Sequence, residues 1–333
     1  MKIIYLKPKS TFRTELCSDT LWGMICWAIR NVYGNFELED FLQSYIENKP
    51  EFIISSTFPY NSIENKRTLF FPKPIIKEKF IDQGSLPRKE RIKKAEQRKK
   101  NKKIQFLDFD NYLNIISGKI QLSEVLDNIV NGNDGSKSPT LKSVSITHNT
   151  VDRLKGGSLI LKDGGQLFHV DEFYFDTNHD KNEKAGLFFL AKGNTDKLEG
   201  ALRYLEHIGI GGDRNIGKGY FKIKIEDFEF EEPEKSNAVT NLSLYYPTKE
   251  ELASFEGNEL FNYKLEERQG YMSFIKHKNF DKPATMMFKE GSVFPVLNND
   301  IYGINPIVKK KSESQAFNVY QYGIGFMIKL KID

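Results

Sequence analysis

The feature that most constrains the fold is a predicted helix, a glycine-rich loop and a predicted strand that follow one another between residues 195 and 225. Apolar residues recur at helical spacing from Leu198 to Ile208, and Gly209 suits a left-handed C-terminal cap. Five glycines lie within residues 209–219, and apolar residues then alternate with lysines from Phe221 onward. A helix followed by a side-chain-poor turn and a strand is typical of α+β folds.

The loop resembles a phosphate-binding P-loop but departs from it in two ways. Gly212, Gly217 and Lys218 match the first seven positions of G-x-x-x-x-G-K-[ST], but Gly219 stands where a magnesium-binding hydroxyl is needed. A P-loop also follows a strand and opens a helix, whereas the order here is reversed. The nucleotide-loop hypothesis is therefore rejected.

Two interpretations of the loop remain. Successive backbone N–H groups in a glycine-rich turn can bind an anion, and Arg214, Asn215 and Lys218 add charge and hydrogen-bonding capacity. Alternatively, the segment is a tight helix-to-strand turn with solvated charges. Composition alone does not separate them.

Length and composition predict a globular protein of about two domains. The chain has 333 residues, of which 39% are hydrophobic and 28% charged. It contains no apolar run of about 18 residues and no signal-peptide core, so we expect a cytoplasmic protein without membrane contact. The two cysteines, Cys17 and Cys26, have no zinc-site companions, so we expect no metal and no cofactor.

Positive charge is concentrated in residues 87–103. This segment holds ten Lys or Arg and two Glu, a local charge of +8 against −4 for the rest of the chain. It would bind phosphates or an acidic protein surface, or it is only a solvated helix or a disordered loop. The cations assigned to this basic insertion are Arg88, Lys89, Arg91, Lys93, Lys94, Arg98, Lys99 and Lys100.

The order of predicted elements indicates two α+β modules in tandem. A strand at residues 2–7 precedes a helix for which Ser18 or Asp19 is the candidate N-cap, and Thr248 with Glu251 forms a capping-box signature for a second such opening. An acidic, proline-containing stretch between them is the predicted linker. The predicted domains are residues 1–232, with an insertion at about 76–140 and the glycine-rich loop at 209–219, and residues 241–333.

Four segments together resemble the RAMP proteins of CRISPR effector complexes. They are the first strand, the Ser18-Asp19-Thr20-Leu21 helix start, the His148-Asn149…Asp152-Arg153 segment and the glycine-rich loop. Their order and the chain length are most similar to the fourth subunit of the type III-A Csm complex, a member of the Cas-five group. The resemblance implies two tandem ferredoxin-like, RRM-related domains, with a basic insertion in the first.

The resemblance also implies a function and a set of RNA-binding residues. Such a subunit is a non-catalytic binder that holds the repeat-derived 5′ tag of the crRNA in antiviral defence. It joins the large polymerase-like Cas-ten-type subunit to the backbone RAMP subunit. The RNA-binding residues implied are Ser18, Lys73, His148, Asn149, Arg153, Gly209, Gly211, Gly212, Asp213, Arg214, Asn215, Gly217, Lys218 and Gly219.

Two other function classes stay open. Some RAMP relatives cleave repeat RNA without metal, which needs a general base such as histidine. Of the five histidines only His148 is a serious candidate, and the segment after the first strand, residues 7–17, contains none. A protein-interaction subunit that never touches RNA would explain the acidic linker but leaves Arg214 without a role.

Overall fold

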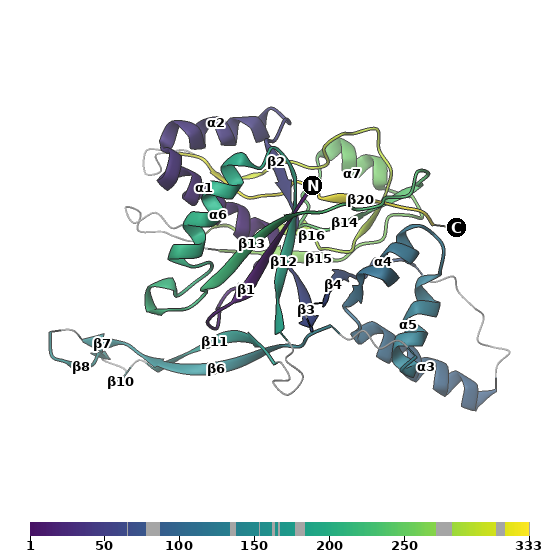
Figure 1. Ribbon diagram of the computed structural model, residues 1–333, viewed down its shortest axis with the longest axis horizontal. Helices are drawn as coiled ribbons and strands as arrows, with labels where there is room; N and C mark the ends of the chain where they lie inside the picture. Colours follow the sequence, from purple (N-terminus) through teal and green to yellow (C-terminus); the bar gives the residue numbers. More distant parts are fainter. Residues whose placement is uncertain are drawn as a thin grey trace.

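A sheet of seven antiparallel strands forms the centre of the protein (Figure 1). The computed structural model describes residues 1–64, 66–77, 87–133, 138–152, 154–161, 164–165, 167–176, 184–270, 282–310 and 317–332. The strand order is β13 (Phe221–Asp227), β1 (Lys2–Pro8), β12 (Lys184–Gly193), β3 (Phe58–Ile63), β4 (Lys66–Pro72) and β5 (Phe106–Asp108), and β2 (Phe52–Ile54) also pairs with β12.

Four of these strands have the ferredoxin-like order. The first strand of the unit, β1, lies between the last, β13, and the third, β12, and β3 lies beyond β12. Helices α1 (Ser18–Tyr33) and α6 (Asp196–Ile208) make the two crossovers, contact each other and cover one face, with α2 (Asn35–Ile46) beside them (Figure 1). The predicted α+β class and the ferredoxin-like first unit are confirmed.

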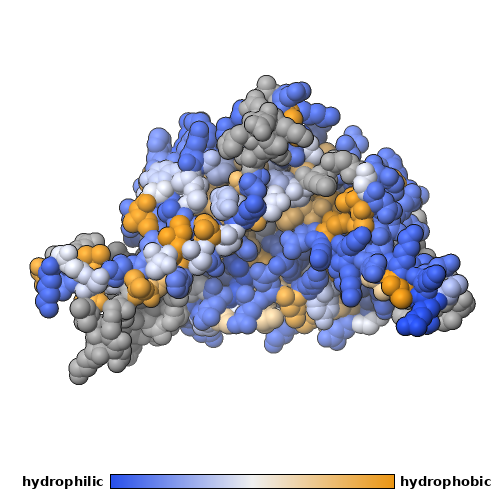
Figure 2. All heavy atoms as spheres, turned by 90° about the horizontal axis from the view of Figure 1, so that it is seen from below, coloured by the Kyte–Doolittle hydropathy of each residue, from blue (hydrophilic) through white to orange (hydrophobic). Residues whose placement is uncertain are grey.

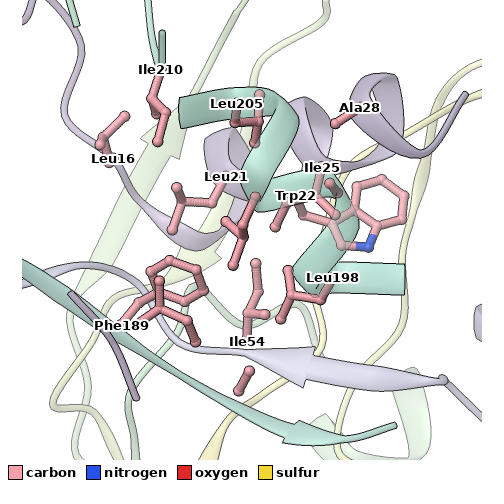
Figure 3. Close-up of a cluster of buried hydrophobic side chains, with 14 of the residues drawn as sticks. Leu16, Leu21, Trp22, Ile25, Ala28, Ile54, Phe189, Leu198, Leu205 and Ile210 are labelled. Atoms are coloured by element: carbon pink, nitrogen blue, oxygen red, sulfur yellow. The ribbon is translucent and has the colours of Figure 1, made fainter. Parts of the chain in front are cut away.

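The covered face holds one hydrophobic core, because alternate strand residues point to opposite faces. Leu21 and Ile25 of α1 and Leu198 of α6 meet Phe189 of β12 and Ile54 of β2 (Figure 3). The helical spacing that starts at Leu198 therefore marks the side of α6 that faces the sheet. The start of α1 corrects one detail, since the helix begins at Ser18 and its N-cap position is Cys17.

The opposite face of the sheet is also buried. Tyr5, Phe58 and Phe188 lie in a second core with α4 (Phe109–Ile116) and α5 (Leu122–Asn131). In RRM domains, aromatic residues on this kind of sheet face stack on RNA bases. Here helices and C-terminal strands cover the face, so it is not open for base stacking.

The C-terminal unit is built on a three-stranded sheet, β17-β14-β20. Its helix α7 has the predicted capping box between Thr248 and Glu251. An isolated bridge pairs Asn262 with Val293 of β17. The order is then β20, β14, β17 and Asn262, which repeats the order of last, first, third and second strand in the first unit. Within the described part of residues 242–332, α7 is the single helix, so a complete second ferredoxin-like domain stays a prediction. The elements are β14 (Ala238–Asn241), α7 (Lys249–Phe255), β15 (Leu265–Arg268), β16 (Thr285–Phe288), β17 (Val293–Pro295), β18 (Ile307–Lys309), β19 (Val319–Tyr320) and β20 (Met327–Leu330).

The predicted linker lies on the body of the protein. Phe228 and Phe230 pack on Phe109 of α4, with ring centres 5.5 and 5.7 Å away. The C-terminal strands share the second core with the first sheet. The proposed division at residues 232–241 stays a prediction, and the two units are joined by a common apolar interior.

Two elements project from opposite ends of one side of the molecule (Figure 1). One is a long hairpin of β6 (Leu141–Asn149) and β11 (Leu167–Phe175), and the other is the basic helix α3 (Arg88–Lys103). Apolar side chains lie along the hairpin, whereas the α3 end is mostly hydrophilic (Figure 2). The far end of the hairpin carries short pairs formed by β7 (Val151–Asp152), β8 (Gly157–Ser158), β9 (Ile160–Leu161) and β10 (Gly164–Gly165).

Candidate nucleic-acid interface

A buried carboxylate joins the glycine-rich loop to the base of the hairpin. Glu172 of β11 is 2% exposed, accepts a hydrogen bond from the Thr11 hydroxyl at 2.6 Å and pairs with Lys218 Nζ at 2.7 Å. Phe12 and Phe173 exchange backbone hydrogen bonds beside this pair. Residues 9–16 after β1, the loop and the hairpin base thus form one connected unit, which we call the junction.

Burial and pairing act in opposite directions on this carboxylate. Burial raises the pKa of Glu172, but the hydrogen bonds from Lys218 and Thr11, with the Lys218 charge, outweigh it and hold the pKa below its usual range. Glu172 is therefore ionised near neutral pH. The negative charge of Glu172 pairs with the positive charge of Lys218. Lys218 therefore stabilises the junction and is not the cation that would bind a ligand.

The side of the loop that faces residues 9–16 is held by several contacts. Arg13 Nη1 pairs with Asp213 Oδ2 at 2.9 Å, and the Gly212 N–H donates to the Thr14 hydroxyl at 3.1 Å. The Gly219 N–H donates to the Thr11 carbonyl at 2.8 Å. Sequence reasoning missed Thr11, Arg13, Thr14 and Glu172. For Thr11, Arg13 and Thr14 the available signal was the run of polar residues directly after the first strand, whereas Glu172 lies far along the chain and carried no local signal.

Most amides of the loop are used inside the protein. The N–H groups of Gly209, Ile210, Gly211, Gly212, Ile216, Gly217, Lys218 and Gly219 all donate to protein acceptors. Over residues 209–219, which are all described, only the N–H groups of Asp213, Arg214 and Asn215 have no protein acceptor. The expected anion-binding backbone is thus limited to this short turn, at the start of η2 (Arg214–Ile216).

The glycines have different local roles. A Cβ on Gly219 would lie 2.0 Å from the Ile210 carbonyl oxygen, so this glycine permits two backbone segments to touch. A Cβ on Gly217 would meet nothing within 4 Å, although both residues have positive φ. Gly219 therefore serves internal packing, and Gly217 lies on an open side of the loop.

Arg214 is the loop cation that remains available. It has no ion pair among the described residues, and its Cγ would lie 3.3 Å from a Cβ on Gly209, at the C-terminal end of α6. A cation at this end of a helix is favoured by the helix dipole. Asn215 follows Arg214 on the same turn.

His148 and Asn149 lie on the hairpin. The His148 ring stacks on Phe168 with 5.5 Å between ring centres, and its Nε2 is enclosed without a hydrogen-bond partner among the described residues. Asn149 Nδ2 donates to the Ser158 hydroxyl. His169 lies opposite Thr147, so its side chain points to the other face of the hairpin from His148. Arg153 lies outside the described residues.

Ser18 is corrected from a ligand-contacting to a structural residue. It is fully buried, and its hydroxyl accepts a hydrogen bond from the Leu244 N–H at 3.0 Å. Its own N–H donates to the Ser56 hydroxyl at 2.9 Å. The helix start therefore joins the two units of the chain and has no face open to RNA.

Lys73 and the basic insertion lie together, away from the junction. Lys73 Nζ donates to the Asn101 carbonyl at 2.8 Å, near the C-terminal end of α3. Gln97 and Asn101 bind the carboxylate of Asp127 on α5, whereas the named cations of α3 are all exposed. The basic segment is thus an ordered helix, anchored to the body of the protein through Gln97 and Asn101. Lys73 helps to anchor the same end of the helix.

One cluster has the composition of a metal site. Ligand atoms of Glu15, Cys17 and Glu266 lie within 4.8 Å of one another. Arg268 and Lys289 already pair with Glu266. Burial raises the pKa of the Cys17 thiol well above its usual value, which disfavours the thiolate that a metal needs.

In the described part of the chain, no helix is both long and apolar enough to span a membrane.

Comparisons with known proteins agree on one family. Residues 8–222 match the model of the RAMP superfamily, and residues 234–330 match that of the CRISPR Csm4 C-terminal domain. The chain is 25% identical to the Csm4 protein of Thermococcus onnurineus over 333 residues, covering 99% of this chain and 96% of that protein. It is 29% identical to the Csm4 protein of Methanocaldococcus jannaschii over 171 residues, covering 46% and 41%.

Solved structures share the fold. The chain matches one from a Csm3–Csm4 subcomplex of the type III-A CRISPR-Cas interference complex, with a TM-score of 0.62, 20% identity and complete coverage of both chains. It also matches one from a Csm1–Csm4 cassette in complex with cA4, with a TM-score of 0.57, 18% identity and coverage of 100% and 98%.

Proposed function

The chain belongs to the RAMP superfamily and carries a Csm4 C-terminal domain, and from this premise we propose that it is the crRNA-binding subunit of a type III-A Csm complex. In this role it holds the repeat-derived 5′ tag of the crRNA in the cytoplasm. It links a Csm1-type large subunit to a Csm3-type backbone subunit, as the pairings of the related solved structures suggest.

The observation that carries the proposal is the junction. A buried Glu172 holds Lys218 and Thr11, whereas Arg214 has no ion pair among the described residues and the amides of Asp213 to Asn215 have no protein acceptor. A cation beside free amides on a fixed turn is suited to the phosphates of a single strand. Both faces of the central sheet are buried, so backbone recognition at this turn needs no open sheet face.

The remaining predicted residues have separate places in the proposal. Gly209, Gly211, Gly212 and Gly217 shape the turn, and Asn215 adds an amide side chain beside Arg214. His148 and Asn149 extend the RNA path along the hairpin. Arg153 stays a predicted RNA ligand outside the described residues. The α3 cations bind phosphates outside the tag, with Lys73 holding that helix in position.

We infer that the subunit is not a nuclease. Metal-free cleavage requires a base that reaches the 2′-hydroxyl. His148 Nε2 is enclosed, and His169 lies on the opposite face of the hairpin, so the described histidines do not form a catalytic pair. Cleavage of repeat RNA in EDTA by the wild-type chain, lost in His148→Ala, would overturn this inference.

The test is binding of the full chain to a fluorescein-labelled single-stranded RNA carrying the repeat sequence of the host CRISPR array. We expect Arg214→Ala to weaken binding by about ten- to hundredfold, because charge-assisted contacts to phosphate contribute about 1.5–3 kcal/mol each. Arg203→Ala is the matched control, since Arg203 is an exposed arginine of α6 outside the loop. Equal affinity of Arg214→Ala and wild type would contradict the loop assignment. Lys218 is unsuitable for this test, because its loss would disturb Glu172.

A further inference from the structure

A cavity of about 220 Å³ lies between α1 and α6, beside the glycine-rich loop. Met24, Trp27 and Asn31 line it from α1, and Tyr204 and Ile208 line it from α6. Arg214 of the loop completes the lining. The cavity therefore connects the helical layer to the loop on which the proposed function depends.

The aromatic residues of the cavity are held by polar contacts. Asn31 Nδ2 donates to the Tyr204 hydroxyl at 3.1 Å, which joins the two helices across the cavity and leaves the Asn31 carbonyl oxygen without a donor among the described residues. The Arg30 guanidinium lies 5.0 Å from the centre of the Trp27 ring. The rings of Trp27 and Tyr204, the Asn31 amide and the Arg214 side chain thus line one small space, with Arg30 packed on the Trp27 ring.

The cavity and the loop are mechanically linked. The Gly211 N–H points to Met24 Sδ at 3.2 Å, and the stem of Arg214 lies over Gly209 at the end of α6. An RNA strand whose phosphate contacts Arg214 therefore passes directly beside the cavity.

We propose that this cavity takes one unstacked nucleobase of the RNA whose backbone runs over the glycine-rich loop. The proposal rests on the proposed function and names a base-binding position within it. Proteins hold single-stranded RNA by stacking splayed bases on aromatic or guanidinium planes and by hydrogen bonds to base edges. Trp27 and Tyr204 provide the planes, and the Asn31 oxygen and Arg214 provide an acceptor and donors. An apolar side chain of a protein partner would leave these polar groups unpaired, which is costly once they are buried.

The experiment measures binding of the full chain to the same repeat-derived RNA, in which a single abasic nucleotide is moved along the strand. Wild type should lose about tenfold in affinity when the abasic site falls at one position, since stacking of one base on an aromatic side chain has this magnitude. In Trp27→Ala the intact RNA should bind about tenfold more weakly, and the sensitivity to that one position should disappear. Trp27→Phe, which keeps a planar ring, should retain most of both effects. Thermal melts of the variants show that each is folded.

Each outcome decides the proposal. Loss of the single-position sensitivity in Trp27→Ala, with Tyr204→Ala behaving alike, supports it. Intact binding of every RNA by folded Trp27→Ala overturns the base position, while Arg214-dependent binding would leave the proposed function standing. Impaired assembly with a protein subunit, at unchanged RNA affinity, assigns the cavity to a protein side chain and also overturns it. Failure of wild type to bind any of the RNAs overturns the proposed function and the base position together.

Discussion

The junction and the basic helix α3 carry positive charge in opposite ways. At the junction, cations are matched to acids: Lys218 pairs with Glu172 and Arg13 with Asp213, which leaves Arg214 as the loop cation without an ion pair among the described residues. Along α3, ten cations are accompanied by two glutamates, and the helix is held mainly through Gln97 and Asn101. The first arrangement would fix the position of one phosphate, whereas the second would attract phosphates without fixing where each one binds. Damage to the junction should therefore change structure, and damage to α3 should change salt dependence.

The largest expected effect comes from Gly219→Ala. The new Cβ would meet the Ile210 carbonyl oxygen at 2.0 Å, at a position with φ of +70°, so the loop must leave its present path. We expect a loss of about 3 kcal/mol or more in the free energy of unfolding, measured by urea denaturation. Gly217→Ala is the control, because its Cβ meets open space and only the positive φ is unfavourable, which costs about 1 kcal/mol. Similar losses in the two variants would show that the close approach to Ile210 does not govern the loop.

The second effect concerns the Glu172–Lys218 pair. Lys218→Met leaves a buried carboxylate without its cation, so we expect a loss of about 2–3 kcal/mol in the free energy of unfolding. The Lys218→Met, Glu172→Gln double variant should lose less than the single variant, because the unpaired charge is then absent. Lys222→Ala is a control, since Lys222 is 67% exposed in its pair with Glu206 and should change stability by less than about 1 kcal/mol.

The same pair predicts a pH dependence. The pKa of Glu172 is lower in the folded protein than in the unfolded chain, so the unfolded chain binds more protons at acidic pH. Its contribution is complete above the ordinary glutamate pKa of about 4.3 and is lost as pH falls through the folded value. Urea melts at pH 7 and at successively lower pH should show a smaller decrease in Glu172→Gln than in wild type. Parallel decreases in the two proteins would contradict the assignment.

Elements whose structure is set by residues near them in the chain could be predicted from the sequence. Periodic leucines and a glycine cap gave α6 within one residue, and Thr248 with Glu251 gave the start of α7, because helices and caps are set by neighbours in the chain. Residues of the glycine-rich loop were found for the same reason.

The roles of Ser18 and Glu172 could not be predicted, because each depends on a distant partner. Ser18 looked like a helix cap, but its hydroxyl binds the backbone of Leu244, and Glu172 meets Lys218 only after the hairpin folds back on the loop. The burial of the second sheet face could not be predicted either, since its aromatic residues alternate in the same way whether RNA or protein covers them.

A smaller effect is expected from reducing the charge of α3. Replacing Lys89, Lys93, Lys99 and Lys100 by glutamine should weaken binding of different single-stranded RNAs to a similar extent. The slope of log K against log salt should fall by about 0.7 for each phosphate that the helix no longer neutralises. Folding should be unaffected, because all four side chains are exposed. The control replaces four exposed lysines of the C-terminal half, Lys235, Lys249, Lys264 and Lys329. An unchanged slope for the α3 variant would favour docking to a protein partner through this helix.

The smallest effect is expected from Arg13→Ala, which tests whether Arg13 acts by neutralising Asp213 or by contacting the RNA. Arg13 is half exposed, so Arg13→Ala should lower the free energy of unfolding by only about 0.5 kcal/mol. The change nevertheless leaves the Asp213 carboxylate unpaired, next to Arg214 and to the free amides of the turn, where it repels a phosphate. RNA affinity in the fluorescence assay should fall about threefold, which corresponds to roughly 0.7 kcal/mol. Asp213→Asn in the Arg13→Ala background should restore affinity, because it removes the repelling charge and keeps a side chain that tolerates positive φ. If affinity stays low in the double variant, Arg13 itself contacts the RNA and is more than the partner of Asp213.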